Sequence, residues 1–341
     1  MDRPDYKAFV KSFDTPLQHS LTSENVTAPK EKVYFGIALT ISILVWVLFT
    51  LCTMGMVWIF LLIGGILAWL SNGLLIASLK SDAVSVHPNQ VGLLDATFRE
   101  VCATLQLREV PDLYIIQSGG FLNAFATRHS GRHFVVVYSS MLESLGPNSA
   151  EMKFLLGHEI GHVRKNHLMK KLFLAPALFL PLIGAAYSRS CETTCDRHGA
   201  LAANDLSAAM RAMMILAGGK EAGKEMDVEH FGEQNKRHRG FFVSWYELIS
   251  GYPTLCRRVQ DLRELETGKH QTSPSRNPLA YLFALFTFGG GFGGRGSLVS
   301  TLLVIYMLAI FAGLALPAIN GALKKGKEAQ RQRQQMQQVH P

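Results

Sequence analysis

The sequence predicts an α+β protein, mainly α-helical, in which membrane-spanning segments flank a polar middle region. Only 18% of its 341 residues are charged and 48% are apolar, whereas soluble domains average about 25% charged residues. A long uncharged stretch, residues 33–79, lies near the N-terminus. Residues 80–276 then mix helical and strand-like periodicity, which is typical of a folded domain. This composition excludes a disordered or fibrous chain.

The N-terminal uncharged stretch predicts a transmembrane helical hairpin. It contains 47 residues between Lys32 and Lys80, and as one helix it would extend about 70 Å, roughly twice the hydrocarbon core of a bilayer. The sequence Cys-Thr-Met-Gly at 52–55 favours a turn, so we expect spans near 33–52 and 56–79. Residues 1–32 are polar and form a separate N-terminal segment. A cleaved signal peptide is not expected, because the first 32 residues are polar and the apolar stretch is longer than the hydrophobic region of a signal peptide.

A second membrane segment is expected over residues 277–323. Residues 296–323 are uncharged and long enough for one crossing, and the glycine-rich stretch 277–294 before them allows either one or two spans. Two spans would return the basic tail, residues 324–341, to the side of the middle region, in agreement with the positive-inside rule. We therefore favour four spans in all, with the middle region and the tail in the cytoplasm.

The charge and cysteine content indicate which molecules the protein contacts and whether its compartment is reducing. The net charge is +8, and the tail supplies +4 of it, since five Lys or Arg residues there face one Glu. This tail is expected to contact anionic lipid headgroups, and no nucleic-acid partner is predicted. The five cysteines are odd in number and scattered, which favours reduced thiols in a reducing compartment.

The middle region predicts helices around a small β structure. Residues 90–107 have helical periodicity, 110–117 resemble a strand, and 121–128 with 133–140 predict a hairpin that turns at 129–132. Helical patterns resume near 148 and continue to about 218. An apolar run at 172–188 contains Pro176 and Pro181, and its role depends on the motifs on either side of it.

The motif with the clearest chemistry is His-Glu-Ile-Gly-His at 158–162, within a helical pattern. His158 and His162 are four residues apart, so they project from one helix face and can bind a single zinc ion. Glu159 is placed to act as general base for an attacking water. Two surface histidines on an amphipathic helix would be the alternative reading of this motif alone.

A third ligand is predicted on the following helix. His167 and Lys165 do not fit the HExxHxxGxxH pattern, so His167 is expected to be structural. Glu192 would complete the zinc site, and Asp196, one turn later, would accept the second N–H of a ligand histidine. Since Glu192 must reach the same metal ion, the apolar run 172–188 cannot cross the membrane and is expected to form a helical hairpin near Pro176–Pro181.

Four motifs in this order resemble those of the HtpX-like membrane zinc proteases, metallopeptidase family 48, to which the CAAX prenyl endopeptidases are related. The motifs are NAFAT (123–127), HEIGH (158–162), SRSCETTCD (188–196) and YPTLCRRVQDL (252–262). The resemblance implies a gluzincin-type domain with one Zn²⁺ per chain. It also implies that Asn123 lies near the developing oxyanion, and that the strand beside it binds an extended substrate. Tyr252 stands where the family has histidine, and its hydroxyl could still donate to the oxyanion.

The function implied is that of a multi-pass membrane zinc endopeptidase, in a bacterial inner membrane with its site facing the cytoplasm. Its polypeptide substrates would be misfolded or membrane proteins, by analogy with the quality-control role of the family. Two alternatives remain open from the sequence. One is a CAAX-type prenyl endopeptidase, which would share every ligand, and the other is a non-catalytic zinc-binding membrane scaffold, for which Glu159 would be unnecessary.

Overall fold

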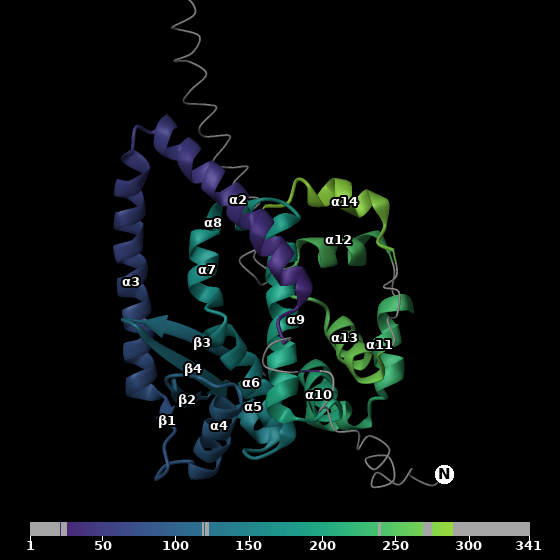
Figure 1. The fold of residues 1–341 in the computed structure, drawn as a ribbon. Helices are drawn as coiled ribbons and strands as arrows, with labels where there is room; N and C mark the ends of the chain where they lie inside the picture. The colour runs from purple at the N-terminus through teal and green to yellow at the C-terminus, as the bar shows by residue number, and fades with distance from the viewer. Residues whose placement is uncertain are drawn as a thin grey trace, which may run out of the picture.

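The computed structural model describes residues 21, 26–117, 119, 123–237, 240–268 and 275–288. Most of the predicted C-terminal membrane segment, and the whole basic tail, lie outside these residues, so their topology stays a prediction. Within the described part, helices surround one small sheet, and two long helices extend beyond it (Figure 1).

The predicted hairpin consists of α2 (Pro29–Cys52) and α3 (Met56–Asp82). Its break lies where the sequence predicts it, and Gly55 has a φ of 84°, a left-handed conformation that glycine adopts without steric cost. Trp46 stacks on Trp58 beside this turn, with ring centroids 6.0 Å apart. Both helices are long and apolar enough to cross a membrane.

The two helices diverge from their turn and reach different parts of the domain (Figure 1). The first, α2, packs against α8 (Ala175–Phe179) and α9 (Ile183–Ala203), whereas α3 lies against the sheet. Along most of their length their large apolar side chains are exposed, for example Leu51 at 72% and Phe60 at 68%. An apolar surface of this extent requires lipid or another partner to cover it.

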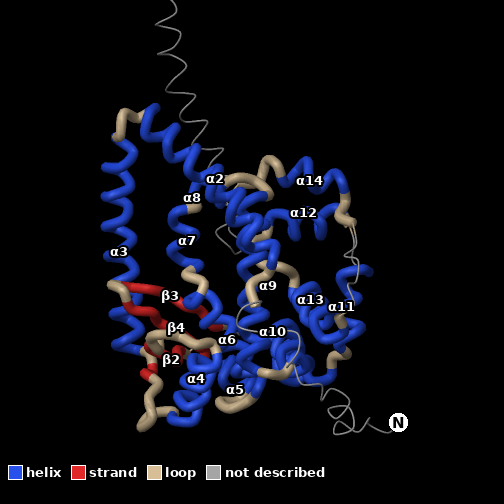
Figure 2. The backbone as a smooth tube through the Cα atoms, in the orientation of Figure 1, coloured by secondary structure: helices blue, strands red, loops and turns tan. Residues whose placement is uncertain are grey.

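The sheet has four strands in the order β1-β2-β4-β3. These are β1 (Val84–Ser85), β2 (Asp112–Ile116), β3 (Ala124–His129) and β4 (Arg132–Tyr138). The predicted hairpin is confirmed, because β3 and β4 pair antiparallel through a turn at Ser130–Gly131. Figure 2 shows the strands gathered beside the lower half of α3. Since β3 lies at an edge, one side of its backbone has no strand partner among the described residues.

Ten further helices complete the described fold. They are α4 (Gly92–Thr104), α5 (Ser139–Leu145), α6 (Ala150–Arg164), α7 (His167–Phe173), α10 (Leu206–Glu225), α11 (Val228–Arg237), α12 (Phe241–Ile249), α13 (Leu255–Thr267) and α14 (Pro278–Ala284), together with α8. The apolar run 172–188 is divided between α7, α8 and α9, and the chain reverses at residues 180–182, as the predicted hairpin requires.

Two helices at the centre, α6 and α9, pack closely against each other through small residues. A Cβ atom on Gly157 would lie 2.6 Å from Ala202 Cβ, and one on Gly199 would lie 2.5 Å from the Phe154 carbonyl oxygen. Such separations are too short for any side chain, so these glycines allow the two backbones to approach. The approach is what brings the histidines of α6 opposite the carboxylates of α9.

Candidate active site

The predicted metal ligands converge at the crossing of α6 and α9. His158 Nε2 lies 3.3 Å from Glu192 Oε2, and His162 Nε2 lies 3.6 Å from Glu192 Oε1. One ligand atom from each of the three residues lies within 4.8 Å of the others. All three side chains are at least four-fifths buried.

This arrangement fits a tetrahedral zinc ion. Zn–N and Zn–O bonds of about 2.0–2.1 Å at tetrahedral angles place neighbouring ligand atoms about 3.3–3.5 Å apart, close to the two separations found here. The Nδ1 atom of His158 contacts Asp196, and that of His162 contacts His167, so the Nε2 atoms of both histidines face Glu192. A set of two imidazoles and one carboxylate is also the ligand chemistry of catalytic zinc.

His158 is held by a buried carboxylate and a buried guanidinium. Its Nδ1–H donates to Asp196 Oδ1 at 2.9 Å, and Arg258 Nε donates to Asp196 Oδ2 at 2.8 Å. Burial opposes protonation, but hydrogen bonds to Asp196 and Glu192 raise the pKa of His158 to about 10. Burial likewise opposes ionisation of Asp196, and Arg258 nevertheless lowers its pKa. The Asp196 carboxylate therefore fixes the ring of His158 with its Nε2 toward the metal position.

His162 is held through a second histidine. Its Nδ1 lies 3.0 Å from His167 Nδ1, and His167 Nε2 lies 3.2 Å from Glu31 Oε1. One proton arrangement satisfies both contacts if His162 Nε2 binds a metal ion: Nδ1–H of His162 donates to His167, and Nε2–H of His167 donates to Glu31. Burial lowers the pKa of His162 to about 3, so its ring is neutral, as a ligand must be.

The general-base candidate, Glu159, faces a cleft beside the metal position. Burial raises its pKa to about 7, which suits a group that takes and returns a proton near neutral pH. The cleft has a volume of about 470 Å³ and contains His158, His162 and Glu192 in its wall. Glu159 therefore shares one cavity with all three candidate ligands.

Asn123 and Tyr252 line the same cleft. Asn123 directly precedes β3, and Tyr252 is in the loop before α13, with 47% of its surface exposed. Partial burial of the hydroxyl, together with the nearby carboxylates of Glu192 and Glu159, raises the pKa of Tyr252 to about 12. Tyr252 is therefore protonated at neutral pH and able to donate a hydrogen bond.

The structure thus brings together every site residue that the sequence predicts, although the roles assigned to these residues stay predictions. Sequence reasoning missed two charged residues, Arg258 and Glu31. Arg258 lies within the motif at 252–262. Nothing in that motif indicates that its guanidinium group pairs with the carboxylate of Asp196, which is 62 residues away. Glu31 lies two residues before the uncharged stretch that starts at Val33. The only sequence signal for a functional role was the position of a carboxylate beside an expected membrane span.

The remaining histidines and cysteines near the site have structural contacts. His198 is fully buried, and its Nδ1 contacts the Thr194 carbonyl oxygen at 2.8 Å. Cys191 and Cys195 are buried, and all five cysteines of the chain are free thiols. Cys191 and Cys195 lie on α9 within three residues of Glu192.

A helix with the HExxH pattern, crossed by a second helix that supplies a glutamate, resembles the metal site of zinc metallopeptidases. Comparison with known proteins agrees with this resemblance: residues 88–184 match the model of Peptidase family M48. The chain is also 32% identical over 173 residues to the plastoglobule-localized metallopeptidase 48, chloroplastic, of Arabidopsis thaliana. Together these findings confirm the predicted relationship to metallopeptidase family 48 and support a metallopeptidase.

The extent of these matches is limited. The aligned residues are 46% of this chain and 49% of the Arabidopsis protein, so the chain spans about half the length of the curated relative that it matches. The family match includes His158 and His162 and ends before Glu192. No solved structure matches this chain.

Proposed function

We propose that this protein is a membrane-bound, zinc-dependent endopeptidase of the HtpX-like type. The observation that carries the proposal is the convergence of His158, His162 and Glu192 on one position, with Glu159 in the same cleft. A structural zinc site needs four protein ligands and no adjacent base. Three ligands beside a carboxylate with a raised pKa are instead the arrangement of hydrolytic zinc sites.

In this proposal each residue has a distinct role in peptide hydrolysis. Zinc would supply Lewis acidity, which polarises the peptide carbonyl and acidifies the attacking water. Glu159 accepts a proton from that water and passes it to the leaving amine. Asn123 and Tyr252 donate hydrogen bonds to the carbonyl oxygen as negative charge develops on it.

The edge strand β3 is the proposed binding surface for substrate. Asn72 of α3 contacts the far end of this strand, donating to the Arg128 carbonyl oxygen at 2.6 Å. The end that starts at Ala124 lines the catalytic cleft. An extended peptide that pairs with this end of β3 would pass directly across Glu159.

The exposed apolar surfaces of α2 and α3 support a membrane location. Both helices join the catalytic domain at the ends remote from their common turn, so the site would lie on one side of the bilayer (Figure 1). Free cysteines support a reducing compartment, and we propose a cytoplasm-facing site in a multi-pass protein of a bacterial inner membrane. The name of the Arabidopsis relative refers to plastoglobules and the chloroplast, so the compartment is itself part of the proposal.

Misfolded or membrane-embedded polypeptides are the proposed substrates, in a quality-control role.

The test combines zinc content with cleavage of unfolded casein by the detergent-purified full chain. Wild type and Glu159→Gln should both hold about one zinc, and only the variant should lose cleavage. Glu143→Gln, an exposed change on α5, is the matched control and should retain both. Absence of zinc from wild type would overturn the proposal. Cleavage of a prenylated CAAX peptide but not of casein would favour the prenyl endopeptidase, and unchanged function of Glu159→Gln in cells would favour the scaffold.

A further inference from the structure

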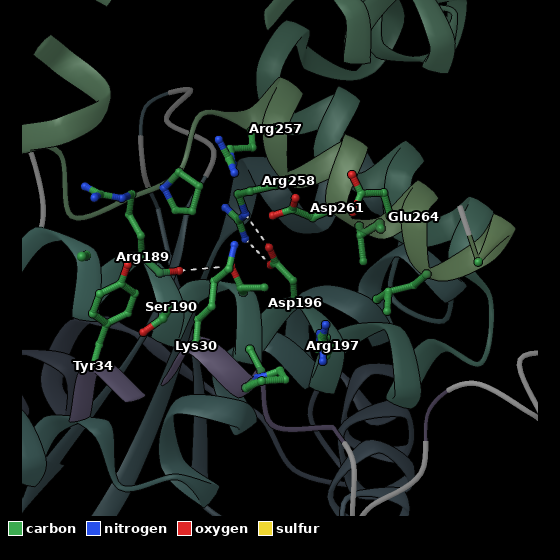
Figure 3. Close-up of a pocket in the computed structure, with 18 of the residues that line it drawn as sticks. Lys30, Tyr34, Arg189, Ser190, Asp196, Arg197, Arg257, Arg258, Asp261 and Glu264 are labelled. Carbon is green, nitrogen blue, oxygen red and sulfur yellow. Dashed lines mark hydrogen bonds and ion pairs between the residues drawn. The ribbon is translucent and has the colours of Figure 1, made fainter. Parts of the chain in front are cut away.

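A second cavity lies behind the catalytic centre, between the start of α2, one face of α9, and α13 (Figure 3). Its volume is also about 470 Å³. The Arg258–Asp196 pair lies on its wall, and Arg258 lines the catalytic cleft as well. The two cavities are therefore separate spaces with Arg258 between them. Nothing in the proposed peptidase chemistry uses this second one.

The lining of this cavity is strongly basic, and we refer to it as the basic cavity. Six cationic side chains line it, against three carboxylates. The cations are Lys30, Arg189, Arg197, Arg257, Arg258 and Arg276, and the carboxylates are Asp196, Asp261 and Glu264. Figure 3 shows Lys30, Arg257 and Arg258 converging on the centre of the space, with Asp261 and Glu264 to one side.

Three of these cations lack a carboxylate partner. Asp196 pairs with Arg258, and Arg276 pairs with Glu247 at 3.0 Å. Among the residues that the structure describes, no carboxylate forms an ion pair with Lys30, Arg189 or Arg197. One Nη of Arg189 donates to the carbonyl oxygens of Leu248 and Ser250, which carry no charge.

The burial and the charged neighbours of the half-buried arginines also favour the binding of an anion. The Nε of Arg197 is buried and has no hydrogen-bond partner among the described residues. Burial, and then the neighbouring charge of Arg276, lower the pKa of Arg189 to about 10. Burial also raises the pKa of Asp261 to about 6, so its carboxyl group takes up a proton more readily than an exposed one. Partly desolvated cations that repel one another are stabilised by a bound anion.

The position of the cavity indicates where such an anion comes from. Pro29 and Lys30, on its wall, begin α2, whose uncharged stretch starts at Val33. Basic residues directly before a membrane span lie at the level of the lipid headgroups. Arginine guanidinium groups match the oxygens of phosphate better than any other side chain does.

We propose that the basic cavity binds the phosphate of an anionic phospholipid headgroup. Lys30 attracts the headgroup at the mouth, and Arg197 supplies a donor inside that has no partner among the described residues. Phosphatidylcholine has the same phosphate, but its choline cation would meet the remaining arginines, so anionic lipids are preferred. A free phosphate could satisfy the same donors and is the competing source of the anion.

The test measures lipid binding by native mass spectrometry of the full chain in detergent. Dioctanoyl phosphatidylglycerol and dioctanoyl phosphatidylcholine are titrated into wild type and into the double variant Lys30→Gln, Arg197→Gln. Arg132→Gln with Lys220→Gln removes the same charge at exposed positions away from the cavity and serves as the control. Wild type and control should bind one phosphatidylglycerol per chain, and the double variant should bind it about tenfold more weakly.

Several outcomes would overturn the assignment. Equal affinity for the two lipids, or equal loss in the control, would show that general charge and not the basic cavity binds the headgroup. If inorganic phosphate, measured by calorimetry, binds wild type with the same dependence on the two residues and phosphatidylglycerol does not bind, the anion is free phosphate and the lipid assignment is wrong. Should the double variant fail to fold, Lys30→Gln alone provides the comparison, because Lys30 is exposed.

Discussion

Glu31 of the first apolar helix contacts His167, with its Oε1 atom 3.2 Å from the histidine Nε2. His167 contacts the candidate ligand His162 in turn, so a carboxylate at the start of α2 supports the metal centre through one intervening ring. Two more contacts fasten the same segment: the Ala28 amide donates to Thr194 Oγ1, and Lys165 Nζ donates to Thr27 Oγ1. The start of the first apolar helix is therefore fixed to the domain beside the candidate metal site.

The first prediction follows from this contact. Glu31→Gln removes the charge that orients His167, so zinc affinity should fall about 10–100-fold, the usual effect of losing an outer carboxylate partner of a ligand histidine. Competition with a chromophoric chelator measures the dissociation constant. Glu143→Gln should leave it unchanged.

The zinc content of the wild type and of Cys191→Ser shows whether Glu31 only supports His167 or also binds a second metal ion. Glu31, His167 and Cys191 could themselves hold an ion. If they do, wild type will contain two zinc ions, and Cys191→Ser will lose one. One zinc in both proteins is the result that we expect.

The second prediction concerns the Arg258–Asp196 pair. Both side chains are more than nine-tenths buried, so Arg258→Gln would leave a buried carboxylate without its cation. Loss of one partner of a buried pair costs about 3–5 kcal/mol of the free energy of unfolding. Thermal unfolding in detergent should show a large fall in the midpoint. Arg211→Gln, which breaks a partly exposed pair with Glu151, should cost no more than about 1 kcal/mol; similar shifts in both variants would contradict the assignment.

The parts of the fold that the sequence predicts are those governed by local pattern. Uncharged length and the glycine at 55 locate the turn between α2 and α3, and alternation locates the β3–β4 hairpin. Helix periodicity likewise predicts that Glu192 and Asp196 share a face. Each of these features depends on residues close together in the chain.

The contacts missed from the sequence are those between distant segments. Glu31 and His167 are 136 residues apart, and Arg258 and Asp196 are 62 apart. Their meeting depends on how α2 and α13 pack against α9, which no local periodicity encodes. The basic cavity was missed for the same reason, since its lining comes from α2, α9 and α13 and from the loops on either side of α13.

The third prediction is the number of protons that zinc displaces. In the metal-free protein His158 has a pKa of about 10 and Glu159 of about 7, whereas His162, at about 3, holds no proton. A ligand histidine must lose its Nε2 proton, and the cation lowers the pKa of Glu159, so zinc binding at pH 6 should release about two protons from the wild type. Zinc affinity therefore rises with pH.

Calorimetry in two buffers of different ionisation enthalpy measures this release. Glu159→Gln has no carboxyl proton to lose and should release about one proton at pH 6, one fewer than the wild type. Equal release from the two proteins at pH 6 would show that Glu159 holds no proton there.

The fourth prediction tests the close approach of α6 and α9. Gly199→Ala places a methyl group 2.5 Å from the Phe154 carbonyl oxygen, so the helices must separate. We expect a loss of about 1–3 kcal/mol in the free energy of unfolding and weaker zinc binding, because Glu192 moves with α9. Gly232→Ala, in α11 with no atom within 4 Å of the new methyl group, is the control and should not destabilise the protein.

The fifth prediction concerns Tyr252, which stands where the related proteases have histidine. If its hydroxyl donates to the carbonyl oxygen as charge develops there, Tyr252→Phe removes one donor without altering the metal ligands. The kcat for casein peptides should fall about 100-fold, the usual cost of losing one such donor, while zinc content and KM stay the same. Tyr252→His should recover part of the lost rate, since an imidazole N–H can donate from the same place. A Phe variant with unchanged kcat would leave Asn123 as the remaining candidate donor and would assign Tyr252 to the wall of the cleft.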